Sequence, residues 1–239
     1  MLERLDYVKI APRRILDAGS GPSRESATLL SKYKTSDIVA LDFSLEILKT
    51  MRKRFFRKNP SRVCAELERL PFGDGSFDLA WSNMSLHWLG EPAAALREFS
   101  RALAPEGLLM FSTLGPDSLK ELRAAAGSER VHAFYDMHDI GDMLVASGFA
   151  APVMDMEMLT FTYASADALL ADLRASGQTC ARADRPRGLA GRSFGTRLRA
   201  ALGAHATFEV VYGHAWKAAP RAAEDVKTVR VFKIGRAHV

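Results

Sequence analysis

The stretch Arg14-Ile15-Leu16-Asp17-Ala18-Gly19-Ser20-Gly21-Pro22 decides the fold of this 239-residue chain. Its apolar residues predict a buried strand, which runs into an acid and then into two glycines one residue apart. Further along, Ile38-Val39-Ala40-Leu41-Asp42 again places an acid after an apolar run. Glycines let the backbone approach a ligand, and the second acid can accept hydrogen bonds from ribose hydroxyls. The two units together predict a nucleoside site at the ends of two strands.

The spacing of the glycines limits which nucleoside fits. A dinucleotide fingerprint has a third glycine three residues after the second, where this chain has Arg24, and no phosphate-binding Gly-Lys-Ser/Thr follows. Asp17 stands inside the motif, where an acid suits a cationic cofactor and repels a pyrophosphate. The segment therefore resembles motif I of the class I methyltransferases that use S-adenosylmethionine (SAM). The resemblance implies SAM as cofactor, with Asp17, Gly19 and Gly21 in its turn and Asp42 at its ribose.

Short β-rich runs alternate with helical patterns over the first half of the chain. The expected strands are residues 13–17, 37–42, 61–65, 78–82 and 107–113, and the expected helices are residues 24–33, 45–57 and 92–104. The last helix is expected to stop at Ala104-Pro105-Glu106, because proline cannot continue it. This alternation predicts an α/β fold with a parallel, doubly wound sheet, Rossmann-like as in the class I methyltransferases.

The pattern loosens beyond residue 115. The expected helices there are residues 116–126, 138–147, 165–175 and 189–202, and the late strands are residues 154–163 and 207–216. We expect a single methyltransferase domain over residues 1–239, with a helical insertion after strand five, within residues 115–205, on the substrate side.

Composition places the chain among ordinary globular proteins. Hydrophobic residues make up 48% and charged residues 26%, and no apolar run approaches the roughly 20 residues that span a bilayer. Cys64 and Cys180 are too few for a disulfide framework or a zinc site, so we expect no metal and a cytoplasmic location. The net charge of +5 permits an acidic partner. The basic residues lack an accompanying aromatic array, so nucleic acid is not expected as a partner. Without a long apolar run, a membrane is not expected as a partner either.

Two segments after the second and third strands resemble cofactor contacts of class I methyltransferases. Phe43 directly follows the ribose acid. Glu66 and Leu67 stand where that class holds the adenine, with the acid accepting from its exocyclic amine. A solvated acid at a helix entry is the alternative interpretation of Glu66.

The end of the fourth strand is expected to lie beside the glycine turn, because ligands bind outside the carboxyl ends of the strands of such sheets. Ser82 and Asn83 stand there and are candidates to contact the methionine part of the cofactor or the reacting group. His87 is a candidate base, although packing beside Trp88 is the interpretation that we favour.

Longer segments narrow the resemblance. They are residues 82–88, 111–123, 137–144 and 207–217, which include Thr-Leu-Gly-Pro-Asp, His-Asp-Ile-Gly and Glu-Val-Val-Tyr-Gly-His-Ala-Trp. Together they resemble the malonyl-acyl-carrier-protein O-methyltransferases of biotin synthesis, from Leu2 to about Phe232. Mitochondrial assembly-factor methyltransferases, thought to act on protein arginine, share the His-Asp-Ile-Gly region and are the nearest competitor.

This resemblance implies an enzyme that methylates the free carboxylate of malonyl-acyl carrier protein. A carboxylate with a pKa of about 4 arrives ionised, so no catalytic residue is expected, only proximity and exclusion of water. An arginine is the expected clamp on that carboxylate. Arg123, Arg182 and Arg187 are the candidates, although each is also typical of a surface or partner-binding arginine.

Two other functions stay open. A protein arginine methyltransferase would use acids to hold a guanidinium and take its proton, and the candidates are Glu121, Asp136, Asp139 and Asp142. The third hypothesis is a non-catalytic SAM-binding protein of the same fold.

Acyl carrier protein is acidic, so a basic docking surface is expected. The preferred surface is the arginine series Arg182, Arg185, Arg187, Arg192, Arg197 and Arg199 in the insertion. The basic cluster within residues 52–58 ends an expected helix and is assigned to a solvated helix end. A monomer is expected.

Both ends of the chain differ from the family that it resembles. Family members carry several tens of residues before the helix that starts here at Met1, so we expect an N-terminally truncated reading frame. Residues 234–239, Ile-Gly-Arg-Ala-His-Val, resemble one frame of a sequencing adaptor, and we expect them to be an artefact.

Overall fold

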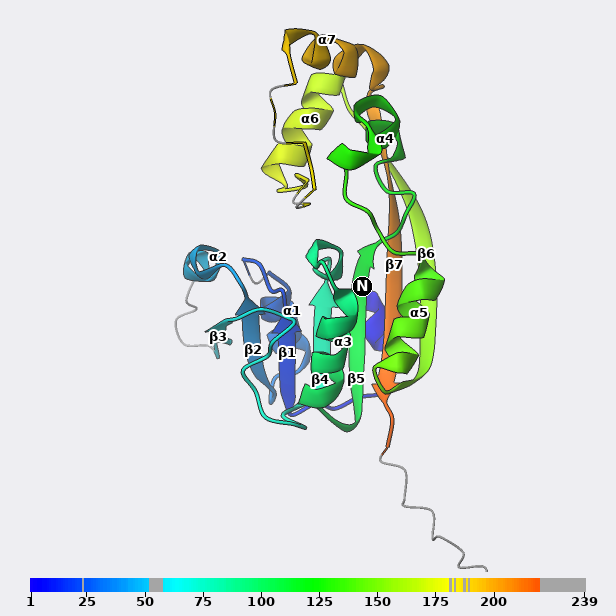
Figure 1. Cartoon of the computed structure of the whole chain (residues 1–239). Coiled ribbons are helices and arrows are strands. Elements are labelled where there is room, and N and C mark those ends of the chain that lie inside the picture. Colours follow the sequence, from blue (N-terminus) through cyan, green and yellow to red (C-terminus); the bar gives the residue numbers. More distant parts are fainter. Residues whose placement is uncertain are drawn as a thin grey trace, which may run out of the picture.

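The computed structural model describes residues 1–219 except Ser23, residues 52–57, Ala181, Ala183, Arg187 and Leu189, with only the backbone of Arg192. Within these residues one seven-stranded sheet runs through the molecule in the order β3-β2-β1-β4-β5-β7-β6, and helices cover it (Figure 1). Most of the basic cluster at 52–58, the candidate clamp Arg187 and residues 234–239 therefore lie outside the described residues.

The elements follow one another in α/β order. The strands are β1 (Arg14–Ala18), β2 (Asp37–Asp42), β3 (Ser61–Cys64), β4 (Phe77–Asn83), β5 (Leu103–Leu114), β6 (Phe149–Thr162) and β7 (His205–Lys217). The α-helices are α1 (Arg24–Lys32), α2 (Leu45–Thr50), α3 (Pro92–Ala102), α4 (Lys120–Ala126), α5 (Met137–Ala146), α6 (Ala166–Ala175) and α7 (Arg192–Ala201). The short 3-10 helices are η1 (Leu2–Asp6), η2 (Leu86–Trp88) and η3 (Ser128–Arg130).

Strands β1 to β5 are parallel, which confirms the predicted doubly wound, Rossmann-like sheet. The sheet is mixed, because β7 pairs antiparallel with both β5 and β6. The direction of β7 follows from the place where the chain turns between β6 and β7. β6 ends beside α6 and α7, beyond the carboxyl ends of β4 and β5, so β7 runs back through the sheet in the opposite direction (Figure 1).

Pro105 lies inside a strand and not in the predicted helix stop. α3 ends at Ala102, and β5 begins at Leu103. The proline is tolerated because the sheet is irregular at this point: the register with β4 shifts after Phe77, and Glu106 has a φ of 60°.

Other boundaries differ by several residues. α2 ends at Thr50, where Met51 takes an extended backbone conformation, whereas the predicted helix continued to residue 57. α4 starts at Lys120 and not at residue 116, and β6 starts at Phe149 and not at residue 154. Helix α7 starts at Arg192, after a glycine with positive φ.

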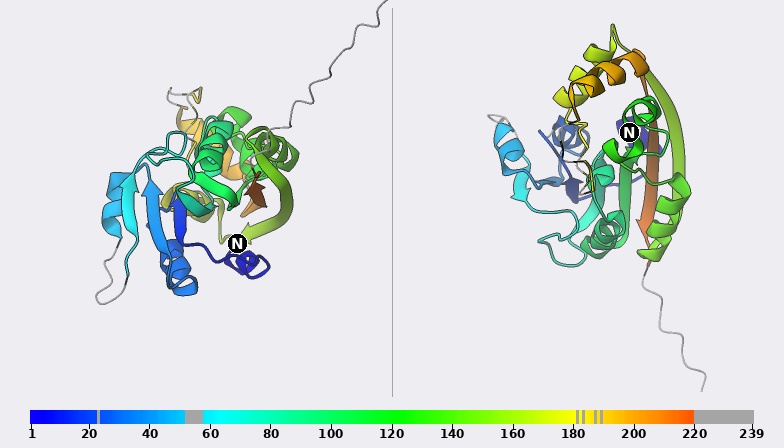
Figure 2. Two further views of the ribbon diagram at one scale, coloured as in Figure 1. Left: turned by 90° about the horizontal axis from the view of Figure 1, so that it is seen from below. Right: turned by 45° about the horizontal axis from the view of Figure 1, so that its top comes forward.

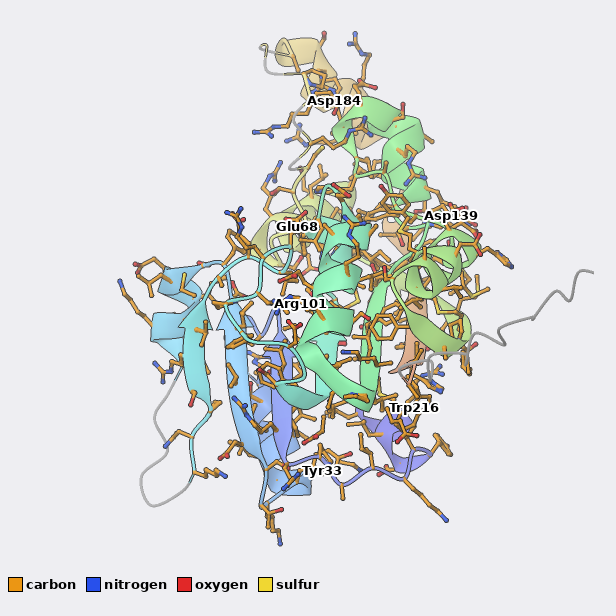
Figure 3. The ribbon with its side chains drawn as sticks, turned by 60° about the horizontal axis from the view of Figure 1, so that its bottom comes forward. Tyr33, Glu68, Arg101, Asp139, Asp184 and Trp216 are labelled. Carbon is orange, nitrogen blue, oxygen red and sulfur yellow. The ribbon has the colours of Figure 1, made fainter. Side chains whose placement is uncertain are left out.

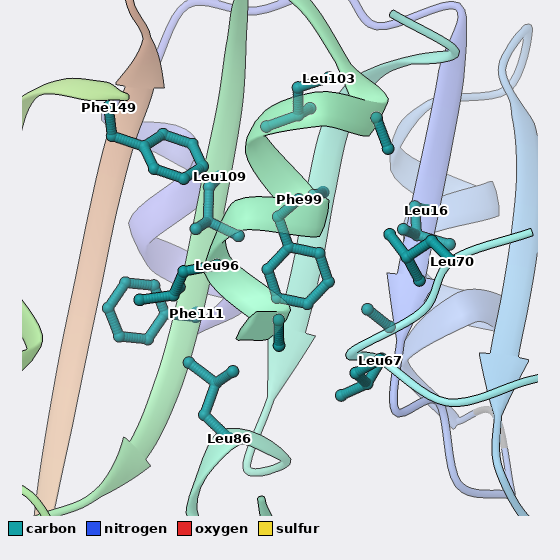
Figure 4. Packing of buried hydrophobic residues seen from close by; sticks show 14 of the residues in the cluster. Leu16, Leu67, Leu70, Leu86, Leu96, Phe99, Leu103, Leu109, Phe111 and Phe149 are labelled. Atoms are coloured by element: carbon teal, nitrogen blue, oxygen red, sulfur yellow. The ribbon is translucent and has the colours of Figure 1, made fainter. Parts of the chain in front are cut away.

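The core lies on both faces of the sheet, because neighbouring strand residues point to opposite sides. Leu16 packs with Leu96, Phe99 and Phe111 on the face covered by α3 and α5 (Figure 4). Ile15, one residue earlier, packs in the second cluster, with residues of α1, β4 and η1. Burial on both faces explains why these strands are continuous apolar runs.

The predicted insertion is built from two separate pieces. α4 and η3 lie between β5 and α5, whereas α6 and α7 lie between β6 and β7. They share a small apolar cluster that includes Leu119, Val131, Leu169 and Leu173, and they lie beyond the carboxyl ends of β4 and β5 (Figures 1 and 2). α5 falls within the same residue range, but its Ile140 belongs to the main core and α5 therefore packs with the sheet.

The packing around β7 leaves no room for a side chain at Gly213. A Cβ at this position would lie 2.3 Å from Cζ of the buried Phe111 and 2.8 Å from Sδ of Met154. We expect Gly213→Ala to lower the free energy of unfolding by about 1–3 kcal/mol, as overpacked cores do, measured by urea denaturation. Gly90→Ala is the control, because a Cβ there meets nothing within 4 Å. Equal stability of the two variants would contradict this packing.

Candidate functional site

The glycine turn after β1 is tied to the end of β2. Gly19 and Gly21 have φ of 74° and 52°, which a residue with a side chain rarely adopts. The backbone N–H groups of Gly19 and Ser20 both donate to the carbonyl of Leu41, at 2.8 and 2.9 Å. A Cβ on Gly19 would also lie 2.4 Å from Cβ of Ser85, so glycine here allows the loop after β4 to rest on the turn.

Asp42 lies beside this turn, as the sequence predicted. Its side chain is buried, one carboxylate oxygen accepts from the Gly21 N–H at 2.9 Å, and the other accepts from the Ser44 N–H at 2.9 Å. Each carboxylate oxygen can accept a second hydrogen bond. A Cβ on Gly21 would meet nothing within 4 Å, so the backbone there is open to a ligand. Ser20, between the glycines, has a buried hydroxyl with no partner among the described residues.

Asp17 is turned towards α1. Its side chain is only 2% exposed, and it accepts a short hydrogen bond from the Ser26 hydroxyl. Burial raises the pKa of Asp17 to about 7, although the bond from Ser26 opposes this shift. Asp17 therefore links β1 to α1 through Ser26, and its direct contact with a cofactor stays a prediction.

Two serines connect the end of β4 to the glycine turn. Ser82 is fully buried and shares a hydrogen bond with Ser85, whose hydroxyl also donates to the carbonyl of Ala18 at 3.3 Å. Asn83 faces the other neighbour, because its side-chain oxygen accepts from the Ser112 hydroxyl of β5 at 2.7 Å. The structure thus brings Ser82 and Asn83 to the same end of the sheet as the turn.

The three remaining cofactor candidates differ in their exposure. Phe43 is 77% exposed and leaves an apolar ring directly after Asp42. Leu67 is buried, with a methyl group 3.9 Å from where a Cβ of Gly19 would stand, whereas Glu66 is exposed.

Arg101 on α3 holds the loop of Glu66 and Leu67, and sequence reasoning missed it (Figure 3). Its guanidinium donates to the carbonyls of Leu70 and Phe72 at 3.1 and 2.7 Å, and it makes a bidentate pair with Glu98. The Glu98 hydrogen bonds, followed by those to Asp74, hold the pKa of Arg101 above its ordinary value. The three-residue spacing of Glu98 and Arg101 predicts an ion pair, but nothing local predicts the contacts to the loop.

Glu209 on β7 is a second residue that the sequence did not reveal. It is 5% exposed, and its carboxylate accepts from the Asp117 N–H at 2.8 Å. Gly115 has no room for a Cβ, which would lie 2.4 Å from the Glu209 carboxyl carbon. Glu209 therefore holds the loop that follows β5 through this hydrogen bond and this close contact.

The described clamp candidates already have partners. Arg123 on α4 donates to the carbonyls of Pro116 and Ser118, at 2.8 and 3.1 Å. Arg182 forms two hydrogen bonds with Asp184, at 2.8 and 2.6 Å. Both guanidiniums therefore order their own loops, and a clamp role for either stays a prediction.

The acids of the arginine alternative have structural contacts or are exposed. Glu121 accepts from the backbone and hydroxyl of Thr207; burial alone would raise the pKa of Glu121, but these bonds lower it below its ordinary value. Asp136 caps α5, and the backbone N–H of His138 lowers the pKa of Asp136. Asp139 and Asp142 are exposed on α5.

Comparison with known proteins defines the class first. Residues 16–111 match the family described as a methyltransferase domain. The fold resembles the crystal structure of the YcgJ protein from Bacillus subtilis, with a TM-score of 0.68, 18% identity, and coverage of 91% of this chain and 97% of that one. The chain is a methyltransferase of the SAM-dependent class.

Two curated relatives define the family. Malonyl-[acyl-carrier protein] O-methyltransferase of Laribacter hongkongensis is 45% identical, over 92% of this chain and 81% of that protein. The protein of the same name from a Methylovorus species is 46% identical, over 93% of this chain and 81% of its own. The chain belongs to the malonyl-[acyl-carrier protein] O-methyltransferase family. Among the residues that the structure describes, no helix is long and apolar enough to cross a bilayer.

The raised pKa of Asp17 makes the stability of the fold depend on pH. The folded state holds its proton to a pH of about 7, against 3.8 for the ordinary group, so the free energy of unfolding falls as the pH rises through this range. Asp17→Asn stays neutral, so its stability relative to the unsubstituted chain should increase with pH. The gain should level off above pH 7, at a few kcal/mol as an order of magnitude.

Urea denaturation at several pH values between 5 and 8 measures this difference, with the exposed Asp142→Asn as control. A stability difference for Asp17→Asn that does not change with pH would contradict the buried, protonated carboxyl.

Proposed function

We propose that this chain transfers the methyl group of SAM to the free carboxylate of malonyl-acyl carrier protein, a reaction of biotin synthesis. The observation that carries the proposal is the identity of 45–46%, over more than nine-tenths of the chain, with proteins of that name. The fold supports it, because the glycine turn, Asp42 and the end of β4 meet at one edge of the sheet.

The cofactor site in this proposal is the junction of β1, β2 and β4. Its residues are Asp17, Gly19, Gly21, Asp42, Phe43, Glu66, Leu67, Ser82 and Asn83. The open backbone at Gly21 and the anchored Asp42 carboxylate fit a ligand with ribose hydroxyls. The exposed Phe43 and buried Leu67 offer apolar surface on which an adenine can lie.

The chemistry needs little from the protein beyond positioning. When bound, SAM supplies a methyl group on a positively charged sulfur, which keeps the electron pair of the broken bond when the carboxylate oxygen takes the methyl. The carboxylate is already ionised near pH 7, so no proton is removed and no base is needed. The chain's own residues then hold the two reactants in line and exclude water.

The partner in this proposal is acyl carrier protein, an acidic protein. Arg197 and Arg199 on α7 are exposed, in the insertion beyond the carboxyl ends of the strands, and could meet it electrostatically. Arg199 forms an ion pair with Asp167 on α6. An acid of the carrier protein that bound Arg199 would therefore replace the carboxylate of Asp167. We further propose a monomer that acts in the cytoplasm, without nucleic acid or membrane as a partner.

Methyl transfer from radiolabelled SAM to malonyl-acyl carrier protein tests the proposed function. We expect label on the carrier protein that is released by mild base, because a methyl ester hydrolyses there. The unmodified carrier protein, with no malonyl group, is the control and should stay unlabelled. Base-stable label on a protein arginine would instead identify an arginine methyltransferase, and SAM binding without transfer would identify a binding protein.

The ribose assignment gives a separate prediction. We expect Asp42→Ala to weaken SAM binding by about 1.5–3 kcal/mol, because a charge-assisted acceptor is lost, as measured by calorimetric titration. Asp37→Ala is the matched control, since Asp37 is an exposed acid at the opposite end of the same strand. Unchanged affinity in Asp42→Ala, or equal loss in both variants, would refute the placement of the ribose.

A further inference from the structure

A narrow pocket lies at the carboxyl ends of β4 and β5. Its walls are mostly apolar and include Leu86, Leu114, Phe134 and Ile140. The polar side chains in its lining are His87, Thr113 and Tyr135. Its open volume is about 20 Å³, which admits a small polar group about the size of one water, such as a carboxylate oxygen.

His87 is the unusual member of this lining. Its side chain is only 7% exposed, and neither ring nitrogen has a hydrogen-bond partner among the described residues. The ring packs against Trp88 and Phe134, with centroid distances of 5.1 and 6.1 Å, as the sequence had suggested. Packing against these rings explains why the imidazole ring is buried. It does not explain the two nitrogens, because burying an unpaired polar group lowers stability, whereas burying an apolar side chain does not.

The imidazole is neutral at ordinary pH. Burial lowers the pKa of His87 to about 4, with a smaller contribution from the neighbouring His132. A neutral imidazole donates one hydrogen bond from one nitrogen and accepts one at the other. His87 can therefore offer a directed hydrogen bond without a positive charge.

The 3-10 helix η2 connects this pocket to the glycine turn. Ser85, which contacts Gly19 and bonds to the carbonyl of Ala18, immediately precedes η2, and η2 carries His87. The contact that joins β4 to the glycine turn thus also fixes the position of His87. From the opposite side, Thr113 belongs to the end of β5, which pairs with β4.

We propose that His87 holds the malonyl carboxylate in this pocket through one hydrogen bond from its ring. This inference rests on the proposed function. It assigns the contact that the sequence had sought in an arginine, because Arg123 and Arg182 have partners elsewhere. A neutral donor also suits the reaction, since a cation would stabilise the negative charge that the carboxylate must use in attacking the methyl group.

Three variants test this role: His87→Leu, which removes the hydrogen bond, His87→Gln, which keeps a donor, and His214→Leu as control. His214 is a partly buried histidine on β7 in a different groove, lined by residues of η1. Methyl transfer to malonyl-acyl carrier protein, SAM affinity by calorimetry and the melting temperature are measured for each.

We expect His87→Leu to lower kcat/KM for malonyl-acyl carrier protein by roughly 10–100-fold, as loss of a hydrogen bond to a charged group does. Its SAM affinity should stay unchanged, and its melting temperature should be equal or higher, because no unpaired nitrogens remain buried. His87→Gln should recover most of the lost activity. His214→Leu should keep the kcat/KM of the unsubstituted chain.

Two results would overturn the inference while the proposed function stands. One is a kcat/KM in His87→Leu equal to that of the unsubstituted chain. The other is a parallel loss of activity and melting temperature in both His87 variants, which would mark the ring as packing only. If the unsubstituted chain itself forms no base-labile ester, the proposed function fails, and the contact to a malonyl carboxylate fails with it.

Discussion

The rest of the site depends on one close approach, in which Ser85 lies against Gly19. A side chain on residue 19 would place its Cβ 2.4 Å from that of Ser85 and would need a φ of 74°. Without this contact, the serine bridge from Ser82 through Ser85 to the carbonyl of Ala18 could not form. The same bridge positions η2, so one backbone constraint sets both the glycine turn and the pocket of His87.

The edge of the sheet carries polar groups that do not stabilise the fold. Asp17 is buried with a pKa raised to about 7, and the ring nitrogens of His87 and the hydroxyl of Ser20 have no partners among the described residues. Each would be better replaced by an apolar group if stability alone mattered. Their concentration around one turn is typical of a site where a ligand completes the hydrogen bonding.

Local patterns predicted the parts of the structure that local chemistry determines. Patterns of residues close in sequence predict the glycine turn, the position of Asp42 beside it and the parallel strands. Other features depend on contacts between residues far apart in the sequence, so no local periodicity predicts them. They are the antiparallel pairing of β7, the loop contacts of Arg101 and the hydrogen bond from Asp117 to Glu209. Pro105 was misjudged because a sheet irregularity, invisible in sequence, admits a proline into β5.

A crystal structure with bound S-adenosylhomocysteine would show directly whether the glycine turn and Asp42 hold the cofactor. We expect ribose hydroxyls within hydrogen-bond distance of the Asp42 carboxylate, the backbone at Gly21 against the ligand, and the sulfur facing the pocket of His87. A ligand that leaves Asp42 without a ribose contact, or whose sulfur faces away from that pocket, would contradict it.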